Sequence, residues 1–342
     1  QVCHVAFSVD LWYTQFCMYM QNRGQKRLRA AKAAFLLPPM NFETDKEFPP
    51  MKISQVLNSG NVTVSCEVFP PKKDAGLPHA KEVVQEIAAL HPAFVSVTYG
   101  AGGTNSGFAM ELAEEVQKSG VPVLSHLTCV SASKADVLAK AEAFRAHGVE
   151  NILALRGDIP KEGTYPRPDQ YLHACALIAD LKARGSFCVG GACYPEGHVE
   201  SPNWAEDLHY LKEKADAGCD FFTSQMFFDN DIFYAFLYRA LSAGITVPII
   251  AGIMPVTNAK QIARSVELSG TCVPRRFRCI ADHFGDDPVA MRQAGIAYAT
   301  EQIIDLIASG VKHIHIYTMN KPDVAAQIFR NLSGIIDPPH AD

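Results

Sequence analysis

From residue 51 onward, the chain alternates short apolar runs with longer amphipathic segments at intervals of roughly thirty residues. The apolar runs have the length and composition of strands buried on both faces, as in a parallel sheet. We expect eight of them, at 62–69, 94–99, 121–129, 152–155, 187–194, 221–228, 247–253 and 313–318. Helices are expected at 79–90, 106–119, 133–147, 168–184, 203–217, 230–243, 257–269, 286–309 and 321–333. This alternation favours an α/β fold of one catalytic domain, a (β/α)8 TIM barrel, over residues 51–338.

A doubly wound open sheet is the alternative fold. Such a sheet more often carries a Gly-x-Gly-x-x-Gly turn after its first strand. Here the first predicted strand ends in Glu67-Val68-Phe69-Pro70-Pro71-Lys72, which is no such turn, so the barrel is the better prediction.

Residues 1–50 differ from the rest of the chain, because they show no clear period and end in Pro49-Pro50. We expect them to form a poorly ordered N-terminal extension. One hypothesis is that Met51 is the natural start of the working protein. Deletion of residues 1–50 should then preserve activity and solubility, and loss of either would contradict the hypothesis.

Composition excludes several classes of protein. The formal net charge is −5 and no long basic tract occurs, so nucleic acid is not an expected partner. No apolar run is long enough for a membrane span. The ten cysteines are scattered without zinc-site spacing, which predicts no metal and a reduced, cytoplasmic protein.

Polar side chains gather where the predicted strands end. In a barrel the active site lies at the carboxyl ends of the strands. Taken singly, these residues have ordinary structural explanations: Glu67 as a paired interior charge, His126 as a hydrogen-bonded core histidine, and Arg156 with Asp158 as an ion pair. Taken together at one face, they favour a ligand site. The set comprises Glu67, Thr98–Thr104, His126, Thr128, Arg156, Asp158, Tyr194, Glu196, His198, Gln225, Asp229, Met254, Pro255, Asn258, Tyr317 and Asn320.

Several of these residues belong to longer motifs, through which residues 51–332 resemble the methylenetetrahydrofolate reductase family in its short, single-domain bacterial form. The motifs occur in the family's order and with nearly its spacing. They are Cys66-Glu67-Val68-Phe69-Pro70-Pro71-Lys72, Phe94–Gly102, His126-Leu127-Thr128-Cys129, Leu155-Arg156-Gly157-Asp158, Tyr194-Pro195-Glu196-Gly197-His198, Gln225-Met226-Phe227-Phe228-Asp229 and Gly252-Ile253-Met254-Pro255-Val256.

The resemblance implies a (β/α)8 flavoenzyme that holds FAD at the carboxyl face of the barrel. Such an enzyme reduces 5,10-methylenetetrahydrofolate to 5-methyltetrahydrofolate by a ping-pong route, with NADH or NADPH as the hydride donor. The flavin carries the redox chemistry, while the protein supplies position and electrostatics. We also expect a homo-oligomer with a small-molecule folate substrate.

The same resemblance implies roles at the folate. Glu67 matches the general acid that protonates N10, which a carboxyl can do at neutral pH only if an apolar or anionic setting raises its pKa. Asp158 matches a catalytic aspartate near both flavin and pterin. Gln225, Gln261 and Arg292 match further folate-contacting positions.

The FAD-contacting positions implied by the resemblance are Thr98, Tyr99, His126, Arg156, Gly157, Asp158, Tyr171, Tyr194, His198, Asp207 and Lys214. Arg156 and Lys214 would balance the charges of FAD, and His198 and Asp207 would hydrogen-bond its polar tail. The chain departs from the family at Thr104-Asn105-Ser106-Gly107 and at Ser265, where other members carry charged and aromatic side chains. The basic segment 272–284 is expected to be a surface feature.

Two other functions compete with the reductase. One is a barrel lyase or aldolase working through a Schiff base or a metal. It needs a lysine at a strand end, and Lys72 lies beyond Pro70-Pro71 in a loop. A non-catalytic barrel subunit of a redox complex would be favoured by missing strand-end carboxylates, yet Glu67 and Asp158 are both present. We rank both alternatives below the reductase.

Overall fold

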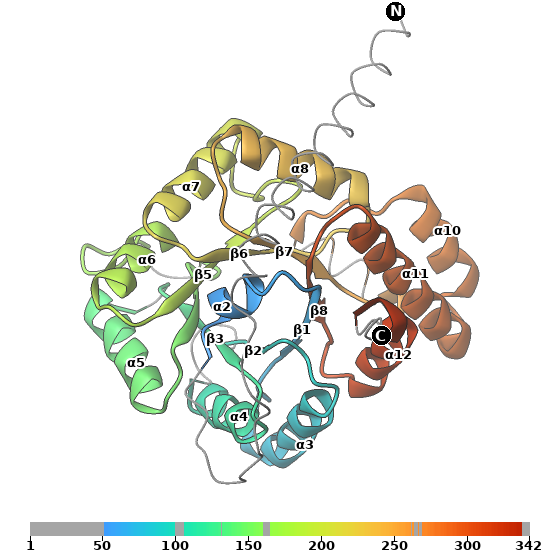
Figure 1. Cartoon of the computed structure of the whole chain (residues 1–342), viewed down its shortest axis with the longest axis horizontal. Coiled ribbons are helices and arrows are strands. Elements are labelled where there is room, and N and C mark those ends of the chain that lie inside the picture. Colours follow the sequence, from blue (N-terminus) through green and yellow to red (C-terminus); the bar gives the residue numbers. More distant parts are fainter. Residues whose placement is uncertain are drawn as a thin grey trace, which may run out of the picture.

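Eight parallel strands close into a barrel in the computed structural model, which describes residues 51–336 except 100–105, 131, 160–164, 261, 263–265, 267 and 268. Each strand pairs with its sequence neighbours, and β8 closes the ring by pairing with β1 (Figure 1). The strands are β1 Thr63–Val68, β2 Val95–Val97, β3 Val123–Thr128, β4 Asn151–Leu155, β5 Cys188–Cys193, β6 Phe221–Ser224, β7 Ile249–Ile253 and β8 His313–Tyr317. The predicted (β/α)8 barrel and all eight predicted strands are confirmed.

Helices surround the strands (Figure 1). They are α3 Leu77–Ala88, α4 Ser106–Lys118, α5 Lys134–Ala146, α6 Ala174–Ala183, α7 Trp204–Asp216, α8 Asn230–Ser242, α10 Arg275–Phe284, α11 Pro288–Ala308 and α12 Pro322–Ile336. The prediction was wrong in three places: α6 begins at Ala174 rather than 168, and neither α10 nor the short helix α2, Ile53–Leu57, was expected. The predicted helix 257–269 lies partly outside the described residues, and the extension 1–50 lies wholly outside them. No helix in the described part of the chain could span a membrane.

Alternation along the strands separates two cores. Outward side chains such as Val64, Val95 and Ile314 pack against the helices in the larger core. Phe94, just before β2, and inward side chains from five strands form a separate apolar layer inside the barrel; the five are Leu124, Leu153, Cys188, Phe221 and Ile250. The interior of the barrel is therefore packed with side chains, and this layer of it is apolar.

A short helix closes the amino-terminal end of the barrel. α2, Ile53–Leu57, buries Ile53 and Leu57 against the inward apolar layer, and Figure 1 shows it lying across the centre of the ring. Asn151 at the start of β4 holds the helix, because its Oδ1 accepts from the Ile53 amide at 2.9 Å and its Nδ2 donates to the Met51 carbonyl at 3.2 Å. Within the described residues, α2 therefore fills the amino-terminal end and leaves the carboxyl face for a ligand.

Candidate active site

Glu67 ends the inward row of β1 and lies among side chains from three other strands. Strand register places Ser96 and Tyr317 beside it. Ser96 Oγ donates to Glu67 Oε2 at 3.3 Å, and His126 Nε2 lies 3.5 Å from the same oxygen. His315 Nε2 is 3.8 Å away, which is an electrostatic contact rather than a hydrogen bond. The Glu67 side chain is 18% exposed, so it remains reachable from the barrel mouth.

This setting differs from the apolar or anionic one that the acid role requires. Burial by itself raises the pKa of the Glu67 carboxyl, but the adjacent His315, His126 and the Ser96 hydroxyl outweigh burial and lower the pKa below its ordinary value. Burial in turn lowers the pKa of His126. The Nε2 atom of His126 has no hydrogen-bond partner, so it is a buried polar atom still available to a ligand.

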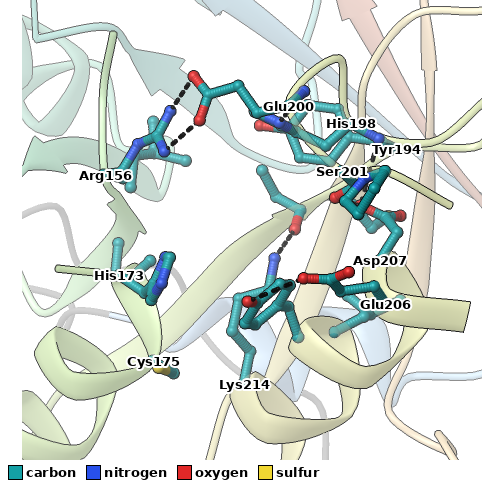
Figure 2. Close-up of a pocket in the computed structure, with 18 residues that line it drawn as sticks. Arg156, His173, Cys175, Tyr194, His198, Glu200, Ser201, Glu206, Asp207 and Lys214 are labelled. Atoms are coloured by element: carbon teal, nitrogen blue, oxygen red, sulfur yellow. Dashed lines mark hydrogen bonds and ion pairs between the residues drawn. The ribbon is translucent and has the colours of Figure 1, made fainter. Parts of the chain in front are cut away.

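A cavity lies beside the barrel mouth, between the ends of β4 and β5 and the helices α6 and α7 (Figure 2). Five of the predicted cofactor residues line it: Arg156, Tyr194, His198, Asp207 and Lys214. The segment after β4, the loop after β5 and the inner face of α7 bring them together. The structure therefore gathers residues that are up to 58 positions apart in the sequence, from 156 to 214.

Arg156 and His198 occupy the outer part of the cavity. Arg156 makes a two-pronged ion pair with Glu200, in which Nη1 and Nη2 donate at 2.6 and 2.7 Å (Figure 2). This pairing lowers the pKa of the Glu200 carboxyl. The His198 ring meets the Tyr194 ring edge-on at 4.6 Å, and burial raises the pKa of the Tyr194 hydroxyl to about 12. Tyr194 is therefore a neutral hydrogen-bonding group at physiological pH.

Lys214 and Asp207 on α7 form the inner wall. Lys214 Nζ donates to the Ala192 carbonyl at 2.5 Å, and burial lowers the pKa of its ammonium. Asp207 accepts from the His198 amide at 3.2 Å and from Ser201 Oγ at 3.1 Å. Asp207 thus fixes the loop that carries His198.

Four more predicted residues lie near the barrel mouth. Gly157 adopts φ +86°, and a Cβ there would come within 2.8 Å of Val130 Cγ1, so only glycine fits this turn. Asp158 follows it and is exposed. Gln225 follows β6, and Thr98 follows β2 with its amide donating to the Val68 carbonyl at 3.0 Å.

Three predicted residues lie elsewhere. Tyr99 faces outward into the larger core, beneath Lys140 of α5. Tyr171 is buried before α6 and donates its hydroxyl to Asp180 at 2.6 Å. Arg292 lies on α11, where it pairs with Asp323 of α12. Gln261, the loop 100–105 and Ser265 lie outside the described residues, so their roles stay predictions.

Two residues near the mouth were not singled out from the sequence. His315 shares the inward row of β8 with Tyr317, and strand alternation was the signal that could have found it. Lys321 lies in the turn between β8 and α12 and donates to Thr257 Oγ1 at 2.7 Å. Met319 and Asn320 place it there through two consecutive left-handed backbone conformations, and Asn320 is bonded to both backbone groups of Phe69.

The cavity fits an elongated cofactor that bears phosphate and a heterocycle. Arg156 and Lys214 provide positive charge, while Tyr194 and His198 provide ring faces and polar edges. His126 Nε2, which has no hydrogen-bond partner, and the sterically required Gly157 lie toward the mouth. Among the described residues, no group of three His, Cys, Asp or Glu side chains could hold a metal ion.

Polar side chains gathered at the carboxyl face of a closed barrel define a (β/α)8-barrel enzyme. Sequence comparison then identifies the family of enzymes. The chain belongs to the methylenetetrahydrofolate reductase family, whose profile matches residues 52–333. This confirms the resemblance inferred from the motifs.

Relatives of two lengths match the chain. It is 34% identical over 274 residues to 5,10-methylenetetrahydrofolate reductase of Pectobacterium carotovorum, covering 80% of this chain and 91% of the relative. The Escherichia coli K12 protein of the same name is 32% identical with the same coverage. Methylenetetrahydrofolate reductase (NADH) 1 of Zea mays is 34% identical over 305 residues, and the match covers 84% of this chain but 50% of that relative. The chain thus spans about half the length of the plant relative.

A solved structure shares the architecture. An uncharacterized protein from Clostridium thermocellum, described as binding two copies of 5-methyl-5,6,7,8-tetrahydrofolic acid, matches with a TM-score of 0.52 at 15% identity. The alignment covers 81% of this chain and 96% of that one. At this identity the likeness supports the barrel fold.

Proposed function

We propose that the protein reduces 5,10-methylenetetrahydrofolate to 5-methyltetrahydrofolate, with hydride passing from NADH or NADPH through bound FAD. Family membership over residues 52–333 gives the reaction class. The observation that carries the flavin assignment is the cavity in which Arg156, Tyr194, His198, Asp207 and Lys214 converge. The expectations of a homo-oligomer and of a cytoplasmic location stay predictions.

Arg156, His198 and Lys214 are the residues that would hold the flavin. The two cations offset the negative charge of the diphosphate, and the buried Lys214 does so where charge is poorly screened by water. When bound, FAD accepts hydride from the nicotinamide and gives it to the folate carbon. Because Arg156 is paired with Glu200, we expect this guanidinium to share its donors between the carboxylate and a phosphate.

Glu67, Asp158, Gln225 and Lys321 are the proposed folate residues. Glu67 would transfer a proton to N10, which opens the five-membered ring and leaves an iminium carbon ready for hydride. The exposed Asp158 carboxylate would accept from the pterin N–H donors and favour the cationic iminium. The Gln225 amide offers both a donor and an acceptor to the pterin edge. Lys321, in the turn between β8 and α12, would offer a cation to the glutamate carboxylates of a folate.

An anaerobic absorption experiment tests this function. The purified protein, incubated with FAD, should show a flavin band that bleaches when NADH or NADPH is added. The band should return when methylenetetrahydrofolate follows. A protein that takes up no flavin would refute the proposal. A flavin that bleaches only with dithionite but recovers with the folate would preserve the folate chemistry and replace the nicotinamide by another donor.

The lyase alternative gains one observation from the structure. Lys214 projects from α7 into the cavity, and burial lowers the pKa of its ammonium, which is the property of Schiff-base lysines. Borohydride would reduce a Schiff base formed with a carbonyl substrate and leave a stable adduct. We expect no adduct at Lys214, because its ammonium is held by the Ala192 carbonyl.

A further inference from the structure

Inside the barrel, a continuous chain of polar groups leads away from Glu67 into the protein. Ser96 Oγ lies 3.3 Å from Glu67 Oε2 and 3.2 Å from His315 Nε2. The other ring nitrogen, His315 Nδ1, lies 2.8 Å from Ser65 Oγ. Ser65, Ser96 and His315 are each at most 1% exposed. Glu67 is therefore the member of this chain that can meet a ligand.

The hydroxyl protons restrict how this chain can be bonded. Ser65 Oγ donates its one proton to the Ile314 carbonyl at 3.0 Å, so it must accept from His315 Nδ1–H. The imidazole then faces Ser96 with Nε2. Ser96 also has one proton, and it can give that proton either to Glu67 or to His315, but not to both.

Two arrangements of the protons satisfy the hydrogen bonds between Glu67, Ser96 and His315, and the two have the same net charge. In the first, Glu67 is ionised and accepts from Ser96, while His315 is protonated on both nitrogens and donates Nε2–H to the Ser96 oxygen. In the second, Glu67 is a neutral acid that donates to the Ser96 oxygen, while Ser96 donates to a neutral His315. The arrangements differ by two short proton shifts through the Ser96 hydroxyl.

We propose that His315 is a positioning residue for the catalytic proton: it stores that proton and returns it through Ser96 to Glu67, which passes it to N10 of the folate. This inference rests on the proposed function. In the step, the His315 Nε2–H bond breaks as a Ser96 O–H bond forms, and the former Ser96 proton moves to Glu67. The Glu67 proton then forms the N10–H bond as the N10–carbon bond breaks. After product release, the store refills from solvent through Glu67.

The surroundings of the chain explain what shifts the proton. A bound folate excludes water from Glu67, and an ion pair deprived of water reverts more readily to two neutral partners. The groups facing His315 and Glu67 are the Phe94 ring, stacked on His315 at 5.8 Å, the Tyr317 ring, edge-on at 5.2 Å, and His126 across Glu67. The proposal also resolves a conflict, because Glu67 needs a proton for catalysis while its neighbours lower its pKa.

The test compares two histidines on the same face of β8. In His315→Asn, the amide can still bond Ser65 but carries no exchangeable ring proton. His313→Asn is the matched control. His313 Nδ1 lies 2.9 Å from Thr63 Oγ1, and this histidine does not contact Glu67. The two half-reactions are followed separately by rapid mixing: flavin reduction by the nicotinamide, and flavin reoxidation by the folate.

We expect His315→Asn to slow the folate half-reaction by roughly 10- to 100-fold at neutral pH and to leave flavin reduction unchanged. Without the store, Glu67 must take its proton from solvent, so the deficit should shrink as the pH falls. Ser96→Ala should behave alike, and the double variant should be no slower than either single variant. Equal loss in both half-reactions, an equal loss in His313→Asn, or a deficit independent of pH would overturn the proposal.

A second readout needs no turnover. In protein labelled with 15N-histidine, resonances missing from His315→Asn identify the His315 ring, and those missing from His313→Asn identify the control. Glu67→Gln and Ser96→Ala should each change the His315 ring shifts and leave those of His313 unmoved. Unchanged His315 shifts would refute the coupling. A wild-type protein without folate activity would refute the proposed function, and the shifts would still decide whether the proton is shared.

Discussion

Lys214 is the buried cation of the cavity, and its contribution to flavin binding can be separated from that of its helix. Lys214→Met removes the charge but keeps an unbranched apolar stem of similar length. We expect flavin affinity to fall by roughly 10- to 100-fold, because a charge-assisted contact contributes about 1.5–3 kcal/mol. Lys212→Met is the matched control, since Lys212 lies on the same helix and pairs with Asp216 at the surface. Flavin fluorescence titration measures both, and equal losses would contradict the assignment.

For individual residues, the sequence was a better guide to which side chains lie together than to the environment around each one. Arg156, Tyr194 and His198 lie in or just after two adjacent strands, so barrel topology alone brings them together. Tyr99 and Tyr171 lie away from the cavity for a physical reason: strand alternation turns the first outward, and a loop buries the second. Their roles as cofactor contacts stay predictions. The two histidines beside Glu67 come from β3 and β8, and no local pattern indicates that they share one carboxylate.

Among the elements, α11 depends on one close approach to the segment after β7. A Cβ on Gly295 would lie 1.8 Å from the Val256 carbonyl oxygen, whereas a Cβ on Gly334 in α12 would contact nothing within 4 Å. Gly295→Ala should therefore destabilise the protein by roughly 2 kcal/mol or more through overpacking. Gly334→Ala should stabilise it by about 0.5–1 kcal/mol, since alanine suits a helix interior better. Urea unfolding of both variants checks this, and similar values for the two would contradict the packing argument.

The two helices that the sequence missed, α2 and α10, were missed for different reasons. The helix α2 has five residues, too few to show a 3.6-residue period, and tertiary contacts from Asn151 hold it in place. The helix α10 buries Phe277 beneath an arginine-rich face, which resembles a charged surface loop in the sequence. The eight strands were predictable because burial on both faces leaves an apolar run that few other elements produce.

For the molecule as a whole, His313 makes stability depend on pH. Burial lowers the pKa of this imidazole to about 4, against an ordinary value of about 6.5. Between these values the unfolded chain binds the proton and the folded chain does not, so stability is lost as the pH falls from about 6.5 to about 4. The interval corresponds to at most about 3.4 kcal/mol. Urea unfolding should show a flatter pH profile for His313→Asn than for the wild type, and parallel profiles would contradict this.

The most direct test of the whole account is Glu67→Gln, measured by anaerobic rapid mixing of the two half-reactions. Glutamine preserves the size of the side chain and its bond from Ser96 but has no proton to give. The flavin should still bind and still be reduced by NADH or NADPH at the wild-type rate. Its reoxidation by methylenetetrahydrofolate should fall by roughly 100-fold or more. Folate reduction at the wild-type rate would show that Glu67 is not the acid, and equal loss in both half-reactions would show that it serves the flavin instead.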